Sequence, residues 1–135
     1  MSEISFKISA RTAGLIGKEN IASAEGAIIE LVKNSYDADA TDCIIFFDNK
    51  NRGNKSLFII DNGHGMDDKI IHDYWMTIGT SNKLHDAFST NKRIKTGAKG
   101  IGRFALDRLG EKVNMFTLPL GKKSGFEWKA DWRIY

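Results

Sequence analysis

Small and apolar residues recur at helical spacing early in the chain. Asn20 and Ser23 are both residues preferred at a helix N-terminus, so the pattern predicts a helix that begins at one of them and runs to about Tyr36. The residues before this helix are expected to be extended. The inward side of the helix is predicted to carry Ala24, Ala27, Ile28, Leu31, Val32 and Ser35.

Two β-rich runs follow, at residues 43–48 and 56–61. The residues between them are rich in Asn and Gly, which favour a reversal of the chain, so the runs are predicted to pair as antiparallel strands. Cys43 begins the first, strongly apolar run, and we expect it to be a buried structural thiol.

The second half of the chain repeats this mixture of helix and strand. Residues 62–65 interrupt the second strand, and Asp67 and Asp68 place acid at the start of a helix through Trp75. Further on, the pattern predicts a helix over 100–109 ended by Gly110 and strands over 112–120 and 126–135. The order predicts an α+β fold, a two-layer sandwich with helices on one face of a mainly antiparallel sheet.

Length and composition restrict the class of protein. A chain of 135 residues that is 41% hydrophobic suits one globular domain, residues 1–135. A single cysteine excludes an internal disulfide and a zinc site built from cysteines. Neither a signal peptide nor an apolar run of about 18 residues is found, so we expect a cytoplasmic protein without a membrane partner.

The net charge of +3 is concentrated in one segment. Residues 80–99 hold Lys83, Lys92, Arg93, Lys95 and Lys99 against Asp86 alone, so the rest of the chain is nearly neutral. The segment is rich in Ser, Thr, Asn and Gly and is predicted to be a mobile loop. A solvated loop and an anion-binding loop both explain its charge.

Three short patterns are candidates for chemistry. Glu30, Asn34 and Asp37 share one narrow stripe of the first helix, either as its solvated side or as a base, a cation ligand and a hydrogen-bonding group. Asp61 ends a strand before two closely spaced glycines, which predicts either an ordinary turn or a fixed hydrogen-bond acceptor for a ligand.

The third pattern is the glycine-rich run 97–102, which opens directly into a helix. Free amides at a helix start attract phosphate, although flexible hinge glycines are the alternative explanation. The spacing matches neither a Walker A loop nor a Rossmann dinucleotide motif.

Together these segments resemble the signature boxes of the GHKL ATPase superfamily, which includes gyrase B subunits, heat-shock chaperones, sensor histidine kinases and MutL proteins. Residues 30–38 resemble its N box, residues 61–66 its Asp-x-Gly-x-Gly box, and residues 97–102 its Gly-x-x-Gly-x-Gly box. The order of the three boxes also agrees with the superfamily.

The resemblance implies a Bergerat fold that binds ATP and Mg²⁺ under a lid at about residues 79–102. It implies that Glu30 activates the attacking water, that Asn34 ligates Mg²⁺ and that Asp61 receives the adenine amino group. The remaining residues that it implies for nucleotide binding are Asp37, Gly63, Gly65, Met66, Thr80, Ser81, Gly97, Lys99, Gly100, Ile101 and Gly102.

The subfamily is left open by conflicting similarities. The N box looks most like MutL, but Gly102 stands where MutL proteins have glutamate, and residues 77–81 are closer to the chaperone pattern. Sensor kinases usually carry a basic residue where Asp37 stands. The alternatives to an ATPase are a non-hydrolysing nucleotide-gated or nucleic-acid-binding module and the ATP-binding half of a histidine kinase.

Complete superfamily modules continue into further strands beyond the point where this sequence ends. We therefore expect the chain to be the N-terminal ATP-binding part of a longer protein whose C-terminal domains act with it. On this expectation the isolated chain has weak or no ATPase activity, and a homodimer would form through the exposed edge of its sheet or through its N-terminal segment.

Overall fold

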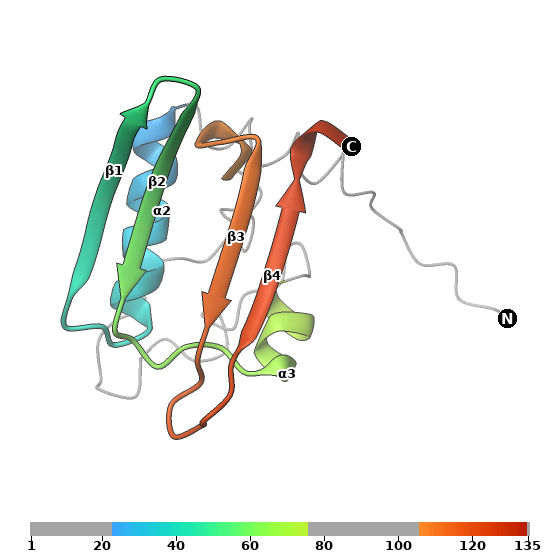
Figure 1. Cartoon of the computed structure of the whole chain (residues 1–135). Helices are drawn as coiled ribbons and strands as arrows, with labels where there is room; N and C mark the ends of the chain where they lie inside the picture. The colour runs from blue at the N-terminus through green and yellow to red at the C-terminus, as the bar shows by residue number, and fades with distance from the viewer. Residues whose placement is uncertain (1–22, 76–105, 135) are drawn as a thin grey trace, which may run out of the picture.

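The computed structural model describes residues 23–75 and 106–134 (Figure 1). The extended opening, the lid over 79–102 and most of the helix over 100–109 lie outside these residues. The candidate residues outside the described part are Thr80, Ser81, Gly97, Lys99, Gly100, Ile101 and Gly102.

The first described helix, α2, spans Ala24–Asp37 and begins where the sequence predicts. The Ser23 hydroxyl caps it by accepting a hydrogen bond from the backbone N–H of Gly26 at 3.1 Å. The predicted inward face is confirmed at Ala27 and Ser35, which are buried, and the predicted residues between them are partly buried. The prediction is wrong for Ala24, which is exposed because it is the first helical residue, beside the exposed cap.

Strands β1 (Cys43–Asn51) and β2 (Asn54–Asp61) form the predicted antiparallel hairpin. Their register runs from Cys43 opposite Asp61 to Asn51 opposite Asn54. Both strands extend further toward the turn than predicted, because backbone pairing resumes after an irregularity between Asp48 and Asn51.

One face of this hairpin turns toward α2, because Cys43 and Asp61 both contact Ser35 of that helix. The alternate residues therefore face away from α2 and remain about half exposed. These outward residues are Ile44, Phe46, Phe58 and Ile60. The prediction that Cys43 is buried is wrong, because the residue is exposed. Its side chain points toward α2, but β1 is the outermost strand and leaves it open to solvent (Figure 1).

The helix predicted after the turn is present as α3 (Asp68–Ile70) followed by the π-helical turn η1 (Ile71–Trp75). Asp67 caps α3 by accepting a hydrogen bond from the N–H of Ile70 at 2.8 Å. Residues 106–108 form a short 3₁₀ turn. At its end, the backbone N–H of Gly110 donates a hydrogen bond to the carbonyl of Leu106.

Strands β3 (Lys112–Thr117) and β4 (Phe126–Asp131) form a second antiparallel hairpin, and each is shorter than predicted. Strand β3 ends at Thr117 because the chain then turns through Pro119, which has no N–H to donate to a ladder. Strand β4 gives way to the 3₁₀ helix η3 (Trp132–Ile134) because Asp131 accepts a hydrogen bond from the backbone N–H of Arg133.

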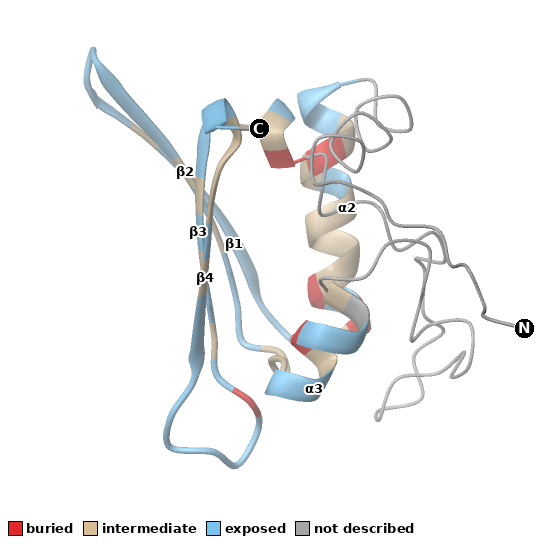
Figure 2. Ribbon diagram, turned by 90° about the vertical axis from the view of Figure 1, so that its right-hand side faces the viewer, coloured by how far each residue is buried: buried red, intermediate tan, exposed pale blue. Residues whose placement is uncertain are grey.

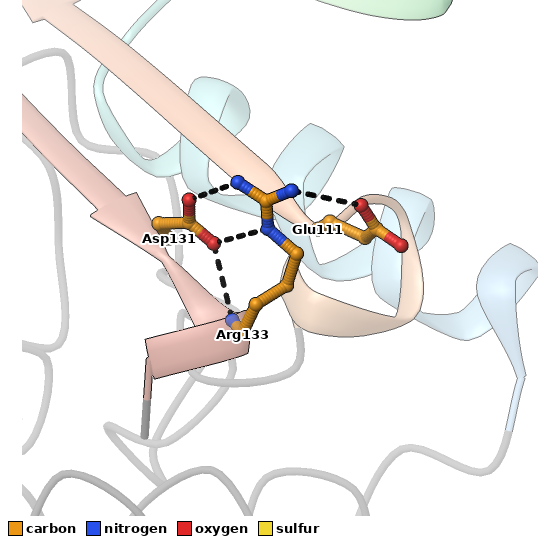
Figure 3. A network of polar contacts seen from close by, with 3 residues as sticks. All are labelled: Glu111, Asp131 and Arg133. Atoms are coloured by element: carbon orange, nitrogen blue, oxygen red, sulfur yellow. Dashed lines mark hydrogen bonds and ion pairs between the residues drawn. The ribbon is translucent and has the colours of Figure 1, made fainter. Parts of the chain in front are cut away.

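A charged network closes this end of the second hairpin (Figure 3). The Arg133 guanidinium donates to both carboxylate oxygens of Asp131 and lies 3.9 Å from Glu111. The N–H of Trp132 also donates to the backbone carbonyl of Glu111 at 2.9 Å. The start of β3 and the end of β4 are thus joined by side chains as well as by the strand ladder.

Figure 2 shows that α2 and α3 lie on the same side of the four strands. The strands are hydrogen-bonded as two separate antiparallel pairs. The fold is therefore α+β with helices on one face, as predicted. Within the described ranges, the structure holds no helix that is both long and apolar enough to cross a membrane.

The turn after β2 packs closely against the chain that leaves β3. Gly65 has a φ of +68°, and a Cβ added there would collide with the carbonyl oxygen of Leu118. Gly121 has a similar φ of +75°, but a Cβ there would meet nothing within 4 Å. Both positions favour glycine for backbone reasons, and only Gly65 also requires it for packing.

This difference predicts unequal costs for two alanine substitutions. Gly65→Ala should lower the free energy of unfolding by about 2 kcal/mol or more, since a left-handed alanine and a collision add together. Gly121→Ala, the matched control, should cost about 1 kcal/mol. Urea unfolding of both variants measures the difference, and equal losses would contradict the packing of Gly65 against Leu118.

The Arg133 guanidinium, which bonds the Asp131 carboxylate, lowers the pKa of that carboxyl from 3.8 to about 2. Because the folded pKa lies below the ordinary value, the pair stabilises the fold above about pH 4 and loses this effect as the pH falls toward 2. We expect an NMR titration of Asp131 to have a midpoint near 2, and Arg133→Gln to return it toward 3.8. A midpoint near 3.8 in the unaltered protein would rule out the network of Figure 3.

Candidate functional site

Asp61, the last residue of β2, has its carboxylate fixed by two hydrogen bonds. Oδ1 accepts from the backbone N–H of Gly63 at 2.8 Å, and Oδ2 accepts from the hydroxyl of Ser35 at 3.0 Å. The residue is nevertheless exposed, and an ionised carboxylate has about four acceptor positions. Asp61 is therefore held in one orientation and retains capacity to accept a hydrogen bond from a ligand.

Ser35 joins α2 to both strands of the first hairpin. Its hydroxyl lies 3.0 Å from Asp61 Oδ2, 3.3 Å from the carbonyl of Leu31 and 3.6 Å from the Cys43 sulfur. Because a hydroxyl carries one proton, the shorter contact to the charged Asp61 is the favoured one. The sequence predicts that Ser35 lies on the inward face of the helix. A hydroxyl among apolar positions on that face is the signal that could have indicated its hydrogen bond to another element.

The glycines after Asp61 allow the turn to approach the end of α2. A Cβ added to Gly63 would lie 2.8 Å from both the Cβ and the carbonyl oxygen of Ala38. The next residue, His64, donates its backbone N–H to that same carbonyl at 2.9 Å. Residues 61–65 therefore form a turn, as one interpretation of the pattern predicts, and this turn also holds Asp61 beside α2.

The Asn62 side chain ties the turn to the connection between α2 and β1. Its Oδ1 accepts from the backbone N–H groups of Thr41 at 2.9 Å and Asp42 at 3.0 Å. Its Nδ2 donates to the Thr41 hydroxyl at 2.8 Å and to the Asp42 carboxylate at 3.1 Å. Sequence reasoning gave Asn62 no role beyond the turn, because its partners lie about 20 residues away.

His64 lies in the loop, as expected from the sequence. Its side chain is partly exposed, and Nδ1 is 3.8 Å from a carboxylate oxygen of Asp39. Asp39 follows α2 with a φ of 60° and has a side chain that is 1% exposed. This contact adds a third connection between the turn and the C-terminal end of α2.

The polar stripe of α2 is partly buried. Glu30 and Asn34 are half-buried and Asp37 is buried, so the interpretation of the stripe as a solvated helix side fails at Asp37. The Glu30 carboxylate forms an ion pair with Lys33 at 3.2 Å. The stripe thus presents a carboxylate and an amide one turn apart, near the middle of the helix.

Asn34 offers one amide oxygen of the kind that binds a hard cation. Among the described residues, no group of three or more His, Cys, Asp or Glu side chains is arranged to hold a metal ion. Mg²⁺ is commonly bound by one or two protein oxygens together with substrate phosphates. The amide oxygen of Asn34 fits that mode of binding and does not require a metal cage made by the protein alone.

The second hairpin supports the turn from its other side. The backbone N–H of Met66 donates to the Thr117 hydroxyl at 2.8 Å, and the N–H of Leu120 donates to the carbonyl of His64 at 2.8 Å. The structure therefore brings Asp61, Gly63, Gly65 and Met66 together between α2 and the end of β3. Glu30 and Asn34 lie on the same helix as Ser35, which contacts Asp61.

Comparison with known proteins identifies the family of the chain. The sequence model of the family described as histidine kinase-, DNA gyrase B- and HSP90-like ATPase matches residues 21–135. The chaperone protein HtpG of Halalkalibacterium halodurans is 30% identical over 127 residues, which cover 84% of this chain and 19% of the chaperone. The chain thus spans about a fifth of that relative's length.

The family match includes all three boxes found in the sequence, and the described part of the chain has the helices and antiparallel strands expected for them. The chain belongs to the histidine kinase-, DNA gyrase B- and HSP90-like ATPase family, the GHKL superfamily.

Proposed function

We propose that this chain binds ATP between α2 and the turn after β2, with Asp61 accepting a hydrogen bond from the adenine amino group. The observation that carries the proposal is the double anchoring of the Asp61 carboxylate by Ser35 and Gly63. An anchored acceptor loses little freedom when a ligand arrives, so more of the hydrogen-bond energy contributes to affinity. Gly63, Gly65 and Met66 then shape the base pocket around it.

The same geometry supports selectivity for adenine. An ionised carboxylate can only accept hydrogen bonds, and adenine presents an amino donor where hypoxanthine and guanine present a carbonyl oxygen. A carbonyl facing Asp61 would leave both groups without a partner and would bring two negative atoms together. Adenine nucleotides should therefore bind in preference to other purine nucleotides.

The polar stripe of α2 suits the triphosphate half of the ligand. Glu30 lies five residues before Ser35, about 7–8 Å along the helix axis. In this proposal Glu30 orients and deprotonates the attacking water. Asn34 lies between Glu30 and Ser35 along the helix, and Asp37, at the end of the helix, is a further nucleotide-binding residue. Mg²⁺, held through Asn34, would neutralise charge on the phosphates.

The ion pair with Lys33 is compatible with this role for Glu30. Both side chains are partly exposed, at 42% for Lys33 and 33% for Glu30. Pairs of this kind contribute about 0–1 kcal/mol, so a nucleotide can displace Lys33 at little cost.

The remaining phosphate contacts are proposed from the motif resemblance. Backbone amides of Gly97, Gly100, Ile101 and Gly102 would bind phosphate oxygens, with Lys99 as a charge partner. Thr80 and Ser81 would add polar contacts at the start of the lid. These residues lie outside the described ranges, so the proposal depends on their sequence alone.

For the longer protein we propose an ATP-driven conformational cycle in which nucleotide changes contacts with other domains or with a second copy. The relative HtpG is named a chaperone, which favours a chaperone-like role. The competing function is nucleotide binding without hydrolysis. Turnover measurements on the unaltered protein and on one substituted variant distinguish this function from an ATPase.

Glu30→Ala should remove hydrolysis and leave nucleotide binding nearly unchanged, because only the water-activating group is lost. We expect the turnover rate to fall by about 100-fold or more in the full-length protein, with little change in the dissociation constant for ATP. Glu25→Ala, in the exposed first turn of α2, is the control for removal of a carboxylate. Unchanged turnover in Glu30→Ala would refute the assignment of the base.

Asp61→Asn should weaken adenine nucleotide binding itself. The substitution keeps the size of the side chain but removes its charge and one acceptor, which should raise the dissociation constant for ADP by about tenfold or more. Asp48→Asn, on β1, is the matched control and should bind ADP normally. Isothermal titration calorimetry measures both, and normal ADP binding by Asp61→Asn would contradict the proposed base contact.

A further inference from the structure

The turn that follows Asp61 is contacted by one side chain of β3, on the side opposite α2. The Thr117 hydroxyl accepts a hydrogen bond from the backbone N–H of Met66 at 2.8 Å, although the two residues are 51 positions apart. We propose that Thr117 is a positioning residue for the adenine half of the site, an inference that rests on the proposed function. Its hydroxyl holds the end of the turn at Met66, one of the residues that the proposed function places around the base.

Thr117 is suited to this role by its position in the second hairpin. It is the last residue of β3 and pairs with Phe126, so its backbone is fixed by the ladder. The residue is half-buried, and its bond with Met66 is partly buried as well. A bond shielded in this way competes less with water than an exposed one.

The chain after Thr117 makes two more contacts with the same turn. The carbonyl of Leu118 lies against Gly65, and the N–H of Leu120 bonds the carbonyl of His64 at 2.8 Å. Both contacts use backbone atoms of residues 118 and 120. The Thr117 hydroxyl is therefore the side-chain contact through which a substitution can test this support.

The opposite side of the turn is fixed independently. Asn62 bonds Thr41 and Asp42, and the N–H of His64 bonds the carbonyl of Ala38. Loss of the Thr117 hydroxyl should thus leave the start of the turn in place and release its end at Met66. The base pocket should then loosen on its Met66 side, so that nucleotide binding weakens while the fold remains.

Thr117→Val is the test, because valine keeps the branched shape that suits a strand and removes only the hydroxyl. We expect the dissociation constant for ADP to rise by about five- to tenfold. Hydrogen exchange of the Met66 amide should become faster, while the amides of β2 keep their protection. Thr117→Ser restores the hydroxyl and should return both quantities to within about twofold of the unaltered protein.

Ser56→Ala on β2 is the control for removal of a hydroxyl from an exposed strand position and should leave ADP binding unchanged. If Thr117→Val does not fold, Thr117→Ala is judged by the same measurements. Normal ADP binding by these hydroxyl-free variants would overturn the inference. So would a Thr117→Ser variant that binds as weakly as Thr117→Val, or exchange that accelerates equally throughout β2.

The failure of this inference can be told apart from failure of the proposed function. If the unaltered protein binds ADP and Thr117→Val binds it equally well, only the role of Thr117 is refuted. If the unaltered protein binds no adenine nucleotide, the proposed function fails and the role of Thr117 fails with it.

Discussion

The arrangement of the site depends on the hydrogen bond between the Ser35 hydroxyl and the Asp61 carboxylate. This 3.0 Å contact joins a helix to the end of a strand that lies 26 residues away in sequence. A hydrogen bond to a charged group contributes more than one between neutral groups, and here it also fixes the direction of an exposed acceptor. This bond brings the two motifs recognised in the sequence side by side.

The turn that follows Asp61 is constrained on both of its sides. Asn62 and His64 attach it to residues 38–42, while Thr117 and the residues after it attach it to the second hairpin. Gly65 occupies a left-handed conformation in the narrow space that remains. Such dense anchoring is typical of a turn that must hold a functional group in one direction.

The sequence predicted those features that depend on local interactions. The Ser23 cap, the antiparallel hairpins and the turn at Asp61 follow from residues within a few positions of one another, and the structure agrees with them. The layered arrangement, with helices on one face of the strands, was also predicted correctly, but two predictions that depended on more distant surroundings were wrong. Cys43 is exposed because β1 is an edge strand, and β4 ends early because Asp131 and Arg133 form their own turn. The contacts of Ser35, Asn62 and Thr117 were not predicted because their partners are distant in sequence.

The most direct test of the account compares ADP with inosine diphosphate, which has a carbonyl oxygen in place of the adenine amino group. Calorimetric titration of the unaltered protein should give saturable binding of ADP and binding of inosine diphosphate that is weaker by at least about tenfold. Equal affinity for the two nucleotides, or no binding of ADP, would contradict the claim that Asp61 receives the adenine amino group.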